Sequence, residues 1–511
     1  MAIDPKHLPE DPRVLQQMVL DLMAQLDREF SERHKIETLL RELLDAKRNR
    51  SSEQLSADQL ALFASAWQAR QAEAEAPAGP DRRDDDDRPG ASELAPNKRA
   101  SGRQPLPRHL KRERIVHDLE DWEKHCAACD QHLHPIGEES SERYEYVPAQ
   151  LTVIEDVCKK YACACTVKTA TKPPQPIEKS TAGASLLAQV IVAKMVDHLP
   201  LNRQEKIFER HGVEISRKTM CGWMAQTAEL LYPLYESLKE VLFQSKVIGT
   251  DDTSVKVLDR KLPFARTGRI WPYYGDKDHA VIVYDYTATR ERAGPERFLQ
   301  RYRGYLQADA YGGYDAFFKD PARGLTEVGC WAHARRYFHK ALESDQSRMG
   351  PALLLIAQLY RIESRARSWP AEARFRLRQR ESRPILDKLH EFLLEIEAEL
   401  LPKSPQGRAV RYTLKNWMAL TRYCEDGDLE IDNNATERAI RGIAVGRANW
   451  TFFGSDEGGK TAAVLRSLVA SCQRAGINPF VWLKDVLSRV ASHPITRICE
   501  LLPHRWAPAQ A

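Results

Sequence analysis

The sequence predicts a multidomain α/β protein with much helix, built around a mixed sheet. The chain has 511 residues, about three times the size of a typical domain, so a single hydrophobic core is not expected. Between residues 246 and 328, short runs rich in branched and aromatic residues first follow one another and then alternate with helical segments. The stretches before and after this region have mainly helical patterns.

The composition excludes several classes of protein. Charged residues make up 29% and hydrophobic residues 42% of the chain, which is ordinary for a soluble globular protein and excludes a collagen-like, fully disordered or membrane chain. The longest apolar run, 186–196, is interrupted by Gln189 and Lys194. The first residues lack the basic segment and the following apolar segment of a secretory signal, so we expect a cytoplasmic protein. Its ten cysteines are then expected to be thiols or metal ligands.

The charge distribution is more informative than its sum. The net charge is only +4, but residues 97–114 carry seven Lys and Arg residues against one acid, Glu113. A basic segment of this density can neutralise phosphates, and it is equally compatible with a solvated linker.

The N-terminal segment has helical periodicity. Leu15, Val19, Leu22 and Leu26 follow a 4-3-4 spacing, and the pattern resumes after a gap near Phe30. This indicates an amphipathic helix that pairs with a partner in a short coiled coil, or that packs on its own domain.

Two close cysteine pairs follow a linker. Cys126 and Cys129 are separated by two residues, and Cys163 and Cys165 by one. A tetrahedral zinc requires four thiolates or imidazoles, and two such pairs can deliver them to one point. The second pair is tighter than the usual spacing, so other ligands remain open: Cys158, His117 and His125.

A helix-turn-helix pattern comes next. Helical stretches at 202–210 and 217–229 are joined by a turn in which Gly212 can adopt a left-handed conformation and Ser216 can cap the second helix. Base or phosphate contacts would then lie at the start of that helix, at Arg217 and Lys218. Two packed helices without DNA fit the pattern as well.

The remaining elements are expected from periodicity and turn signals. We expect strands at 246–249, 254–258, 270–274, 281–286, 304–307 and 325–328. We expect helices at 296–302, 311–318, within 340–425 and at 434–444, an aromatic strand at 449–453, and helices to about residue 492.

Carboxylates follow two of these strands. Asp251 and Asp252 come after 246–249, and Asp309 comes after 304–307, at positions where side chains emerge at the edge of a sheet. Glu437 falls in the first turn of a helix that an Asn caps. Three such acids could hold two Mg²⁺ ions about 4 Å apart. Taken singly, each Asp could be a turn residue, and Glu437 could pair with Arg441.

The stretch 454–461 matches the phosphate-loop pattern G-x-x-x-x-G-K-[ST]. Asp456 and Glu457 would place negative charge inside the cradle, and only 52 residues follow Gly459. These are too few for the rest of a nucleotide-binding domain, so we expect no nucleotide hydrolysis.

Several motifs resemble one family, the transposases of the bacterial insertion-sequence-sixty-six type with a DDE triad. The similar segments occur in order along nearly the whole chain: 198–205, 249–253, 307–315, 329–336, 432–438, 446–450 and 478–480. They include Gly-Cys-Trp-Ala-His-Ala-Arg-Arg at 329–336 and Asp-Asn-Asn-Ala-Thr-Glu-Arg at 432–438.

This resemblance implies an RNase H-like catalytic core with the triad Asp251, Asp309 and Glu437, a zinc domain and an N-terminal helix for DNA binding or multimerisation. The expected organisation is an N-terminal helical segment at 1–70, a linker at 71–114, a zinc-binding domain at 115–180, a helix-turn-helix-like region at 181–245, a catalytic core at 246–455 with a helical insertion at 340–425, and a C-terminal helical element at 456–511.

The implied activity is two-metal strand transfer. Its substrates are double-stranded DNA at the element ends and at the target, and the protein would associate with the nucleoid. Asp251 would bridge two Mg²⁺ ions, which Asp309 and Glu437 complete, while Arg438 and Arg441 hold phosphates. The resemblance also implies a homo-oligomer on DNA and two smaller accessory proteins of the same element. A catalytically inactive DNA-binding regulator and a general nuclease of the same fold remain alternatives.

Overall fold

The computed structural model describes residues 59–61, 63–65, 67, 150–162, 167–169 and 174–508. The chain divides into two compact units, of residues 1–76, 173–206 and 215–511 in one and 77–172 and 207–214 in the other. In the second unit, β1 (Lys160–Ala162) and β2 (Val167–Thr169) form an antiparallel pair. The predicted coiled coil, the basic segment and the cysteines Cys126, Cys129, Cys163 and Cys165 lie outside the described residues.

Helices precede the main sheet, as the sequence predicts. They are α3 (Ala184–Met195), α4 (Leu201–Arg210), α5 (Arg217–Leu230) and α6 (Tyr232–Leu242). The turn before α5 has the predicted features, because Gly212 has a φ of +76° and the Ser216 hydroxyl accepts the Thr219 N–H at 3.1 Å. No helix among the described residues combines the length and the apolar character needed to cross a membrane.

The main sheet contains the strands that the sequence predicts. They are β3 (Val247–Thr250), β4 (Thr253–Val257), β5 (Arg266–Tyr274), β6 (Ile282–Thr287), β7 (Gly304–Gln307) and β8 (Leu325–Val328), with the short β9 (Phe452–Phe453) beside β4. All of them begin and end within one residue of the prediction except β5, which begins at Arg266 rather than at 270, and β9.

Strands β3 and β4 act as one strand with a gap at the two aspartates. Thr250 pairs with Tyr273 and Thr253 with Ile270, so both segments follow the same edge of β5 in a single register. This register places Pro272 opposite Asp251. Because proline has no N–H to donate, the ladder opens there, and the aspartates interrupt the strand.

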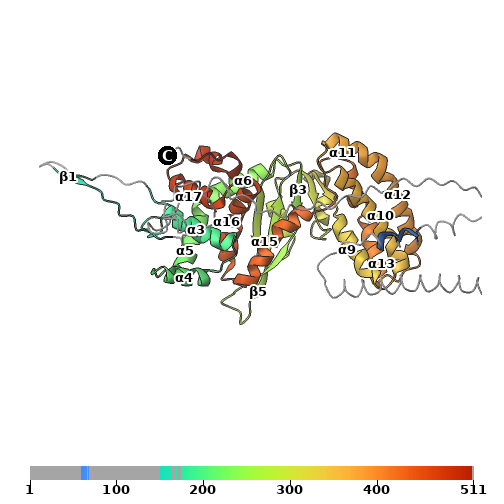
Figure 1. Ribbon diagram of the computed structural model, residues 1–511, viewed down its shortest axis with the longest axis horizontal. Coiled ribbons are helices and arrows are strands. Elements are labelled where there is room, and N and C mark those ends of the chain that lie inside the picture. Colours follow the sequence, from blue (N-terminus) through green and yellow to red (C-terminus); the bar gives the residue numbers. More distant parts are fainter. Residues whose placement is uncertain are drawn as a thin grey trace, which may run out of the picture. The chain divides into compact units, whose positions relative to one another are not determined.

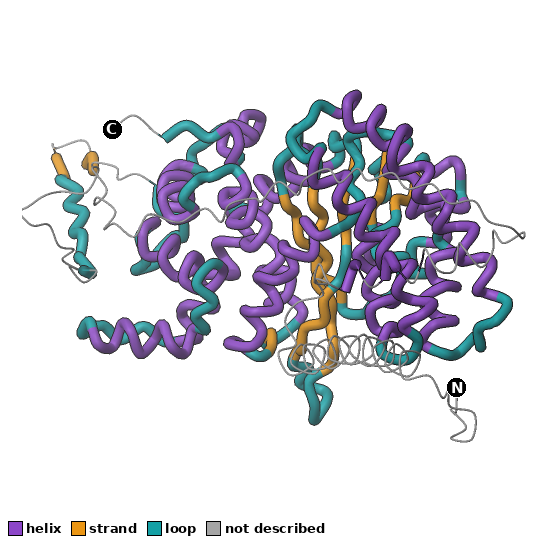
Figure 2. Tube along the Cα trace, turned by 45° about the vertical axis from the view of Figure 1, so that its right-hand side comes forward, coloured by secondary structure: helices purple, strands orange, loops and turns teal. Residues whose placement is uncertain are grey.

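The resulting sheet, whose strands are orange in Figure 2, combines antiparallel and parallel pairs. The strand formed by β3 and β4 is antiparallel to β5, and β5 is antiparallel to β6. On the other side, β7 is parallel to β3, and β8 is parallel to β7. This is the mixed sheet of the RNase H-like core that the resemblance implies.

The helix α16 (Asp456–Arg474) covers the outer edge of the sheet (Figure 1). The Ser467 and Ser471 hydroxyls accept the N–H groups of Tyr284 and Ile282 on β6 at 2.7 and 3.0 Å. Both serines are buried, so side chains of a helix satisfy main-chain groups that a further strand would otherwise pair. The last helix is α17 (Pro479–Arg489).

A helical insertion separates β8 from the helix that carries Glu437. Its helices are α9 (Trp331–Leu342), α10 (Gln346–Arg365), α11 (Ala371–Leu377), α12 (Arg383–Glu397), α13 (Pro405–Lys415) and α14 (Trp417–Thr421). A π-helical turn at Arg378–Ser382 joins α11 to α12. The insertion has its own core, in which Trp331, Leu389 and Val410 are fully buried, and this core continues into the sheet at Val328.

Several expected elements are wrong in detail. Residues 449–453 were expected as a strand, but α15 (Asn434–Trp450) continues to Trp450, whose ring stacks on Phe453 at 4.7 Å between centroids. This stacking keeps the aromatic run on a helix end, and only Phe452–Phe453 is extended. Two small helices are also shifted from their predicted positions. The helix predicted at 296–302 is α7 (Ala293–Phe298), and the helix predicted at 311–318 is α8 (Asp315–Lys319).

Asp285 on β6 provides a test of how burial affects stability. Burial raises the pKa of its carboxyl from 3.8 to about 6, although Arg297 lies 3.8 Å away. Protonation is therefore favoured in the folded state, and this group's contribution to stability falls as the pH rises from about 4 to about 6.

Asp285→Asn removes this penalty. The difference between the pKa of about 6 and the ordinary value of 3.8 corresponds to at most about 3 kcal/mol, and the partial exposure of the Asp285 side chain reduces this figure. We therefore expect the free energy of unfolding to rise by about 1–2 kcal/mol at pH 7.5 and to stay unchanged at pH 4. Urea unfolding at both pH values measures the difference. The exposed control Glu291→Gln should change neither value.

Candidate active site

The sheet places two of the predicted acids side by side. In the parallel pair of β3 and β7, Val247 lies opposite Tyr305 and Gly249 opposite Gln307. Continuing this register by two residues brings Asp251 level with Asp309. Adjacent strands lie about 4.8 Å apart, so the two carboxylates emerge from neighbouring points on one edge.

The helix α15 brings the third acid to the same place. Asn433, just before α15, donates its side-chain N–H to the Thr250 carbonyl at 2.8 Å. On the adjacent residue of β3, a Cβ at Gly249 would collide with the Thr436 hydroxyl and would lie 2.8 Å from Asn433 Oδ1. The start of α15 therefore lies directly against β3, and Glu437 follows Thr436 in its first turn.

Glu437 lies close to residues of α9 for which no role in the site is predicted from the sequence. Its Oε1 lies 3.8 Å from His333 Nε2, and its Oε2 lies 3.7 Å from Arg336 Nη2. The Cys330 sulfur, a ring nitrogen of His333 and a carboxylate oxygen of Glu437 all lie within 4.8 Å of one another. Cys330, His333 and Arg336 belong to the 329–336 motif, which is the only sequence signal for them. Burial raises the pKa of the Cys330 thiol to about 12, so it is protonated.

The electrostatics show that the acids share one site. Burial first, and then the negative charges of Asp309, Asp252 and Glu437, raise the pKa of Asp251 to about 7. The Asp252 N–H, which donates to Asp251 Oδ1 at 2.7 Å, acts in the opposite direction but does not offset them. A cation at this position would remove the repulsion.

The neighbouring Asp252 has a different environment. Its Oδ2 accepts Arg269 Nη1 at 2.7 Å, and its Oδ1 accepts Arg290 Nε at 2.8 Å, with the side chain only 3% exposed. The Arg290 guanidinium also lies over the Tyr311 ring, 4.2 Å from its centroid, and the Tyr311 N–H donates to Asp309 Oδ1. Asp252 therefore holds two arginines beside the site, and both its oxygens are already engaged.

The donor set fits a hard divalent cation. Glu437 Oε1 is buried and accepts no hydrogen bond, which leaves a carboxylate oxygen available to a ligand. Asp251 and Asp309 add further carboxylate oxygens, the ligands that Mg²⁺ prefers.

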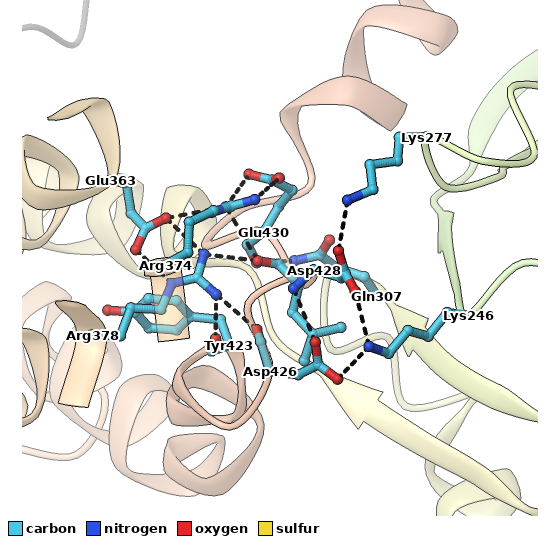
Figure 3. Close-up of polar contacts among 11 residues, drawn as sticks. Lys246, Lys277, Gln307, Glu363, Arg374, Arg378, Tyr423, Asp426, Asp428 and Glu430 are labelled. Atoms are coloured by element: carbon cyan, nitrogen blue, oxygen red, sulfur yellow. Dashed lines mark hydrogen bonds and ion pairs between the residues drawn. The ribbon is translucent and has the colours of Figure 1, made fainter. Parts of the chain in front are cut away.

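The loop 425–433, which leads into α15, is bound on one side by the insertion (Figure 3). The Arg378 side chain, 1% exposed, donates to the carbonyls of Tyr423, Asp426 and Leu429 at 2.6 to 2.9 Å. It also pairs with Glu363 on α10 at 2.7 Å. Arg374 bonds both Glu363 and Glu430, so two arginines of the insertion hold this loop.

The sheet binds the other side of the same loop, also in Figure 3. Lys246 pairs with Asp426 at 2.6 Å and with Asp428 at 3.0 Å, and Lys277 pairs with Asp428 at 2.9 Å. The Gln307 amide, at the end of β7, donates to the Glu430 carbonyl at 2.8 Å. Glu437 is therefore positioned by a loop that is anchored to both the insertion and the sheet.

The predicted DNA-contacting residues lie in two places. Arg438 and Arg441 are exposed and lie about one turn apart on α15, next to Glu437. Arg217 and Lys218 are exposed at the start of α5, and Arg217 pairs with Glu205 at 3.5 Å. The phosphate-loop pattern is not a loop, because residues 456–461 form the first turns of α16 and Lys460 pairs with Glu457.

Comparison with known families places the chain. Residues 179–461 match the model described as the transposase IS66 family, and residues 467–504 match the IS66 C-terminal element. The chain belongs to the IS66 family of transposases. Residues 123–166 of this transposase-family chain match a zinc-finger binding domain of transposase IS66, and 37–115 match a model described as transposase C of IS166 homeodomain.

Two relatives align with most or all of the chain. The uncharacterized protein y4jD of Sinorhizobium fredii is 31% identical over 530 aligned residues, which cover 100% of this chain and 99% of the relative. The uncharacterized protein y4hP of the same species is 33% identical over 433 residues, covering 80% and 78%.

Gly249→Ala tests the contact between β3 and α15. The added methyl must displace Thr436 or Asn433, so we expect the free energy of unfolding to fall by about 1–3 kcal/mol. Strand cleavage should fall as well, because the start of α15 moves. Thermal unfolding measures the first effect. The control Gly222→Ala, with open space around its Cβ position, should be neutral or stabilising.

Arg378→Met tests the anchoring of the loop 425–433. The change leaves Glu363, which is 9% exposed, with one partner fewer. It also removes a donor from three carbonyls, of which only that of Leu429 still accepts Arg374. We expect the free energy of unfolding to fall by about 3–5 kcal/mol. The exposed control Arg376→Met, which loses a surface pair with Glu372, should cost less than about 1 kcal/mol. Equal losses for both variants in urea titrations would contradict the anchoring role.

Proposed function

We propose that this chain is a DNA transposase that binds the terminal inverted repeats of an insertion sequence, hydrolyses DNA strands at the element ends and joins the freed 3′-hydroxyls to target DNA. The observation that carries the proposal is that the β3–β7 register, continued by two residues, brings Asp251 level with Asp309, and that the charges of Asp309 and Glu437 both act on Asp251. Carboxylates gathered from separate parts of a chain are the ligand set of two-metal phosphoryl transfer.

Asp251, Asp309 and Glu437 would hold two Mg²⁺ ions. Bound Mg²⁺ would activate the attacking water or 3′-hydroxyl and stabilise the leaving oxygen. Asp251 is the shared ligand in this proposal, since the charges of both other acids act on it. His333 and Arg336 orient Glu437 from α9, and they keep its carboxylate directed at the site.

In the first step, water attacks the scissile phosphorus and the bond to the 3′-oxygen breaks, which leaves a 3′-hydroxyl and a 5′-phosphate. In the second step, that hydroxyl attacks a target phosphodiester and displaces its 3′-oxygen. Arg438 and Arg441 on the exposed side of α15 would bind phosphates next to the acids, and Arg217 and Lys218 would bind the terminal repeats.

A structural zinc is part of the proposal. Cys126, Cys129, Cys163 and Cys165 fall inside the stretch that matches the zinc-finger model. Four thiols in two close pairs are a donor set that suits a tetrahedral zinc.

Replacing the acids tests the active site. Asp251→Asn, Asp309→Asn and Glu437→Gln should each reduce Mg²⁺-dependent cleavage by more than about a hundredfold, since even outer partners of metal ligands are worth about 10–100-fold. The substrate is a labelled duplex that carries the terminal sequence of the element encoding this chain. Binding of that duplex should persist in all three variants. Glu457→Gln, an exposed acid on α16, is the matched control.

The outcomes separate the alternatives. Cleavage retained by any one of the three variants refutes the assignment of that acid. A wild-type protein that binds the duplex without cutting it supports an inactive regulator, whereas equal cutting of unrelated DNA supports a general nuclease.

A further inference from the structure

The loop between β4 and β5, here called the hairpin tip and comprising residues 258–265, extends past the end of the sheet. Pairing between β4 and β5 continues to Val257 and Arg266, whereas β6 stops pairing with β5 at Arg269. Figures 1 and 2 both show this loop projecting beyond the ends of the other strands. The hairpin tip therefore lies beyond the end of β6, at the end of β4 and β5, where β9 pairs with the last two residues of β4.

The hairpin tip exposes apolar side chains. Phe264 is 64% exposed, Leu262 is 41% exposed and Leu258 is 42% exposed, and Pro263 is exposed between the first two. Single exposed apolar residues are common on protein surfaces. Three of them with a proline in one short loop form a patch, and such a patch indicates a contact surface.

Exposed cations lie in the hairpin tip and next to it in the sequence. Arg260 and Lys261 on the hairpin tip and Lys256 on β4 are exposed. The acid of the loop, Asp259, lies 3.6 Å from Arg266, a cation that it shares with Asp456. The hairpin tip therefore combines exposed apolar side chains with exposed cations, which complements a base stack flanked by phosphates.

The base of the hairpin tip is fixed to the rest of the fold. Arg266 pairs with Asp456 at the start of α16, and Tyr286 donates to the same carboxylate. The Leu258 N–H donates to the Phe453 carbonyl at 2.9 Å. Inside the loop, Asp259 Oδ1 accepts the Lys261 N–H at 2.9 Å. The apolar side chains are thus presented on a preorganised support, which lowers the entropy cost of binding.

The hairpin tip is connected directly to the proposed active site. Asp251 and Val257 follow the same edge of β5, because β3 and β4 share one register on either side of the aspartates, and at about 3.3 Å per residue the two residues are about 20 Å apart. The loop adds up to about 10 Å. At about 3.4 Å per base pair, the hairpin tip would reach DNA about 6–9 base pairs from the phosphate held at Asp251.

We infer that the hairpin tip is a DNA wedge, in which Phe264 and Leu262 insert between base pairs about 6–9 pairs from the cut while Arg260 and Lys261 bind the flanking phosphates. The inference rests on the proposed function, because the DNA is the one bound for cleavage. A second copy of the chain fits this surface less well, since a symmetric contact would bring the cations of two hairpin tips together.

The test uses the full-length protein and the element-end duplex with 2-aminopurine placed singly at each position within about 12 base pairs of the cut. We expect wild type to raise the fluorescence at one or two adjacent positions about 6–9 base pairs from the cut, as a base loses its stacking. The double variant Leu262→Ala/Phe264→Ala should lose this rise and bind about tenfold more weakly. Phe264→Trp should retain the rise.

The charge variant Arg260→Gln/Lys261→Gln should keep the fluorescence change at saturating protein, while its plot of log affinity against log salt becomes shallower by about 2. The matched control is Leu401→Ala, an exposed leucine of the insertion that should change neither readout.

The outcomes separate this inference from the proposed function. A wild type that neither binds nor cuts the duplex overturns both. A wild type that cuts while no position brightens, or while the double variant brightens as strongly, overturns the wedge alone. Loss of self-association in the double variant with unchanged DNA binding assigns the hairpin tip to a protein contact and also overturns the wedge.

Discussion

The mutual repulsion of Asp251, Asp309 and Glu437 is the constraint on which the rest of this structure depends. Without a cation, their proximity costs free energy, and the charges of Asp309 and Glu437 add to the effect of burial in raising the pKa of Asp251 to about 7. Two of the acids are held by the β3–β7 ladder, whose register cannot shift without turning their side chains to the other face. The third depends on the contact between Gly249 and the start of α15, which only a glycine permits.

The helical insertion contributes to the same task. It lies between β8 and α15 in sequence, and its buried Arg378 holds the main chain of the loop 425–433. Lys246 and Gln307 hold that loop from the sheet. Burying an arginine is expensive unless its donors are all used, so this network fixes one position of the loop rather than a range of positions. Both carboxylate oxygens of Asp252 accept hydrogen bonds from arginines, so Asp251 is the available carboxylate of the two neighbours.

The sequence predicted the parts of the fold that depend on local patterns. The strands around Asp251 and Asp309 are short branched runs bounded by turn residues, and their positions agree with β3 and β7. The neighbours of Glu437 could not be predicted, because the crossing of α9 and α15 brings together residues about a hundred positions apart in sequence. The anchoring role of Arg374 and Arg378 could not be predicted, because many of their partners are main-chain carbonyls, which every residue carries. The aromatic run near 450 resembled a strand because the stacking of Trp450 on Phe453 across the helix end leaves no periodic signal.

The covering of β6 by α16 has a consequence for how the chain is made. Ser467 and Ser471, which satisfy the N–H groups of Tyr284 and Ile282, are synthesised about 190 residues after that strand. Until they leave the ribosome, the outer edge of the sheet presents unpaired main-chain groups that can template pairing with another nascent chain. Glu437 also emerges late. A product truncated before residue 437 would therefore combine an incomplete set of acids with an aggregation-prone edge.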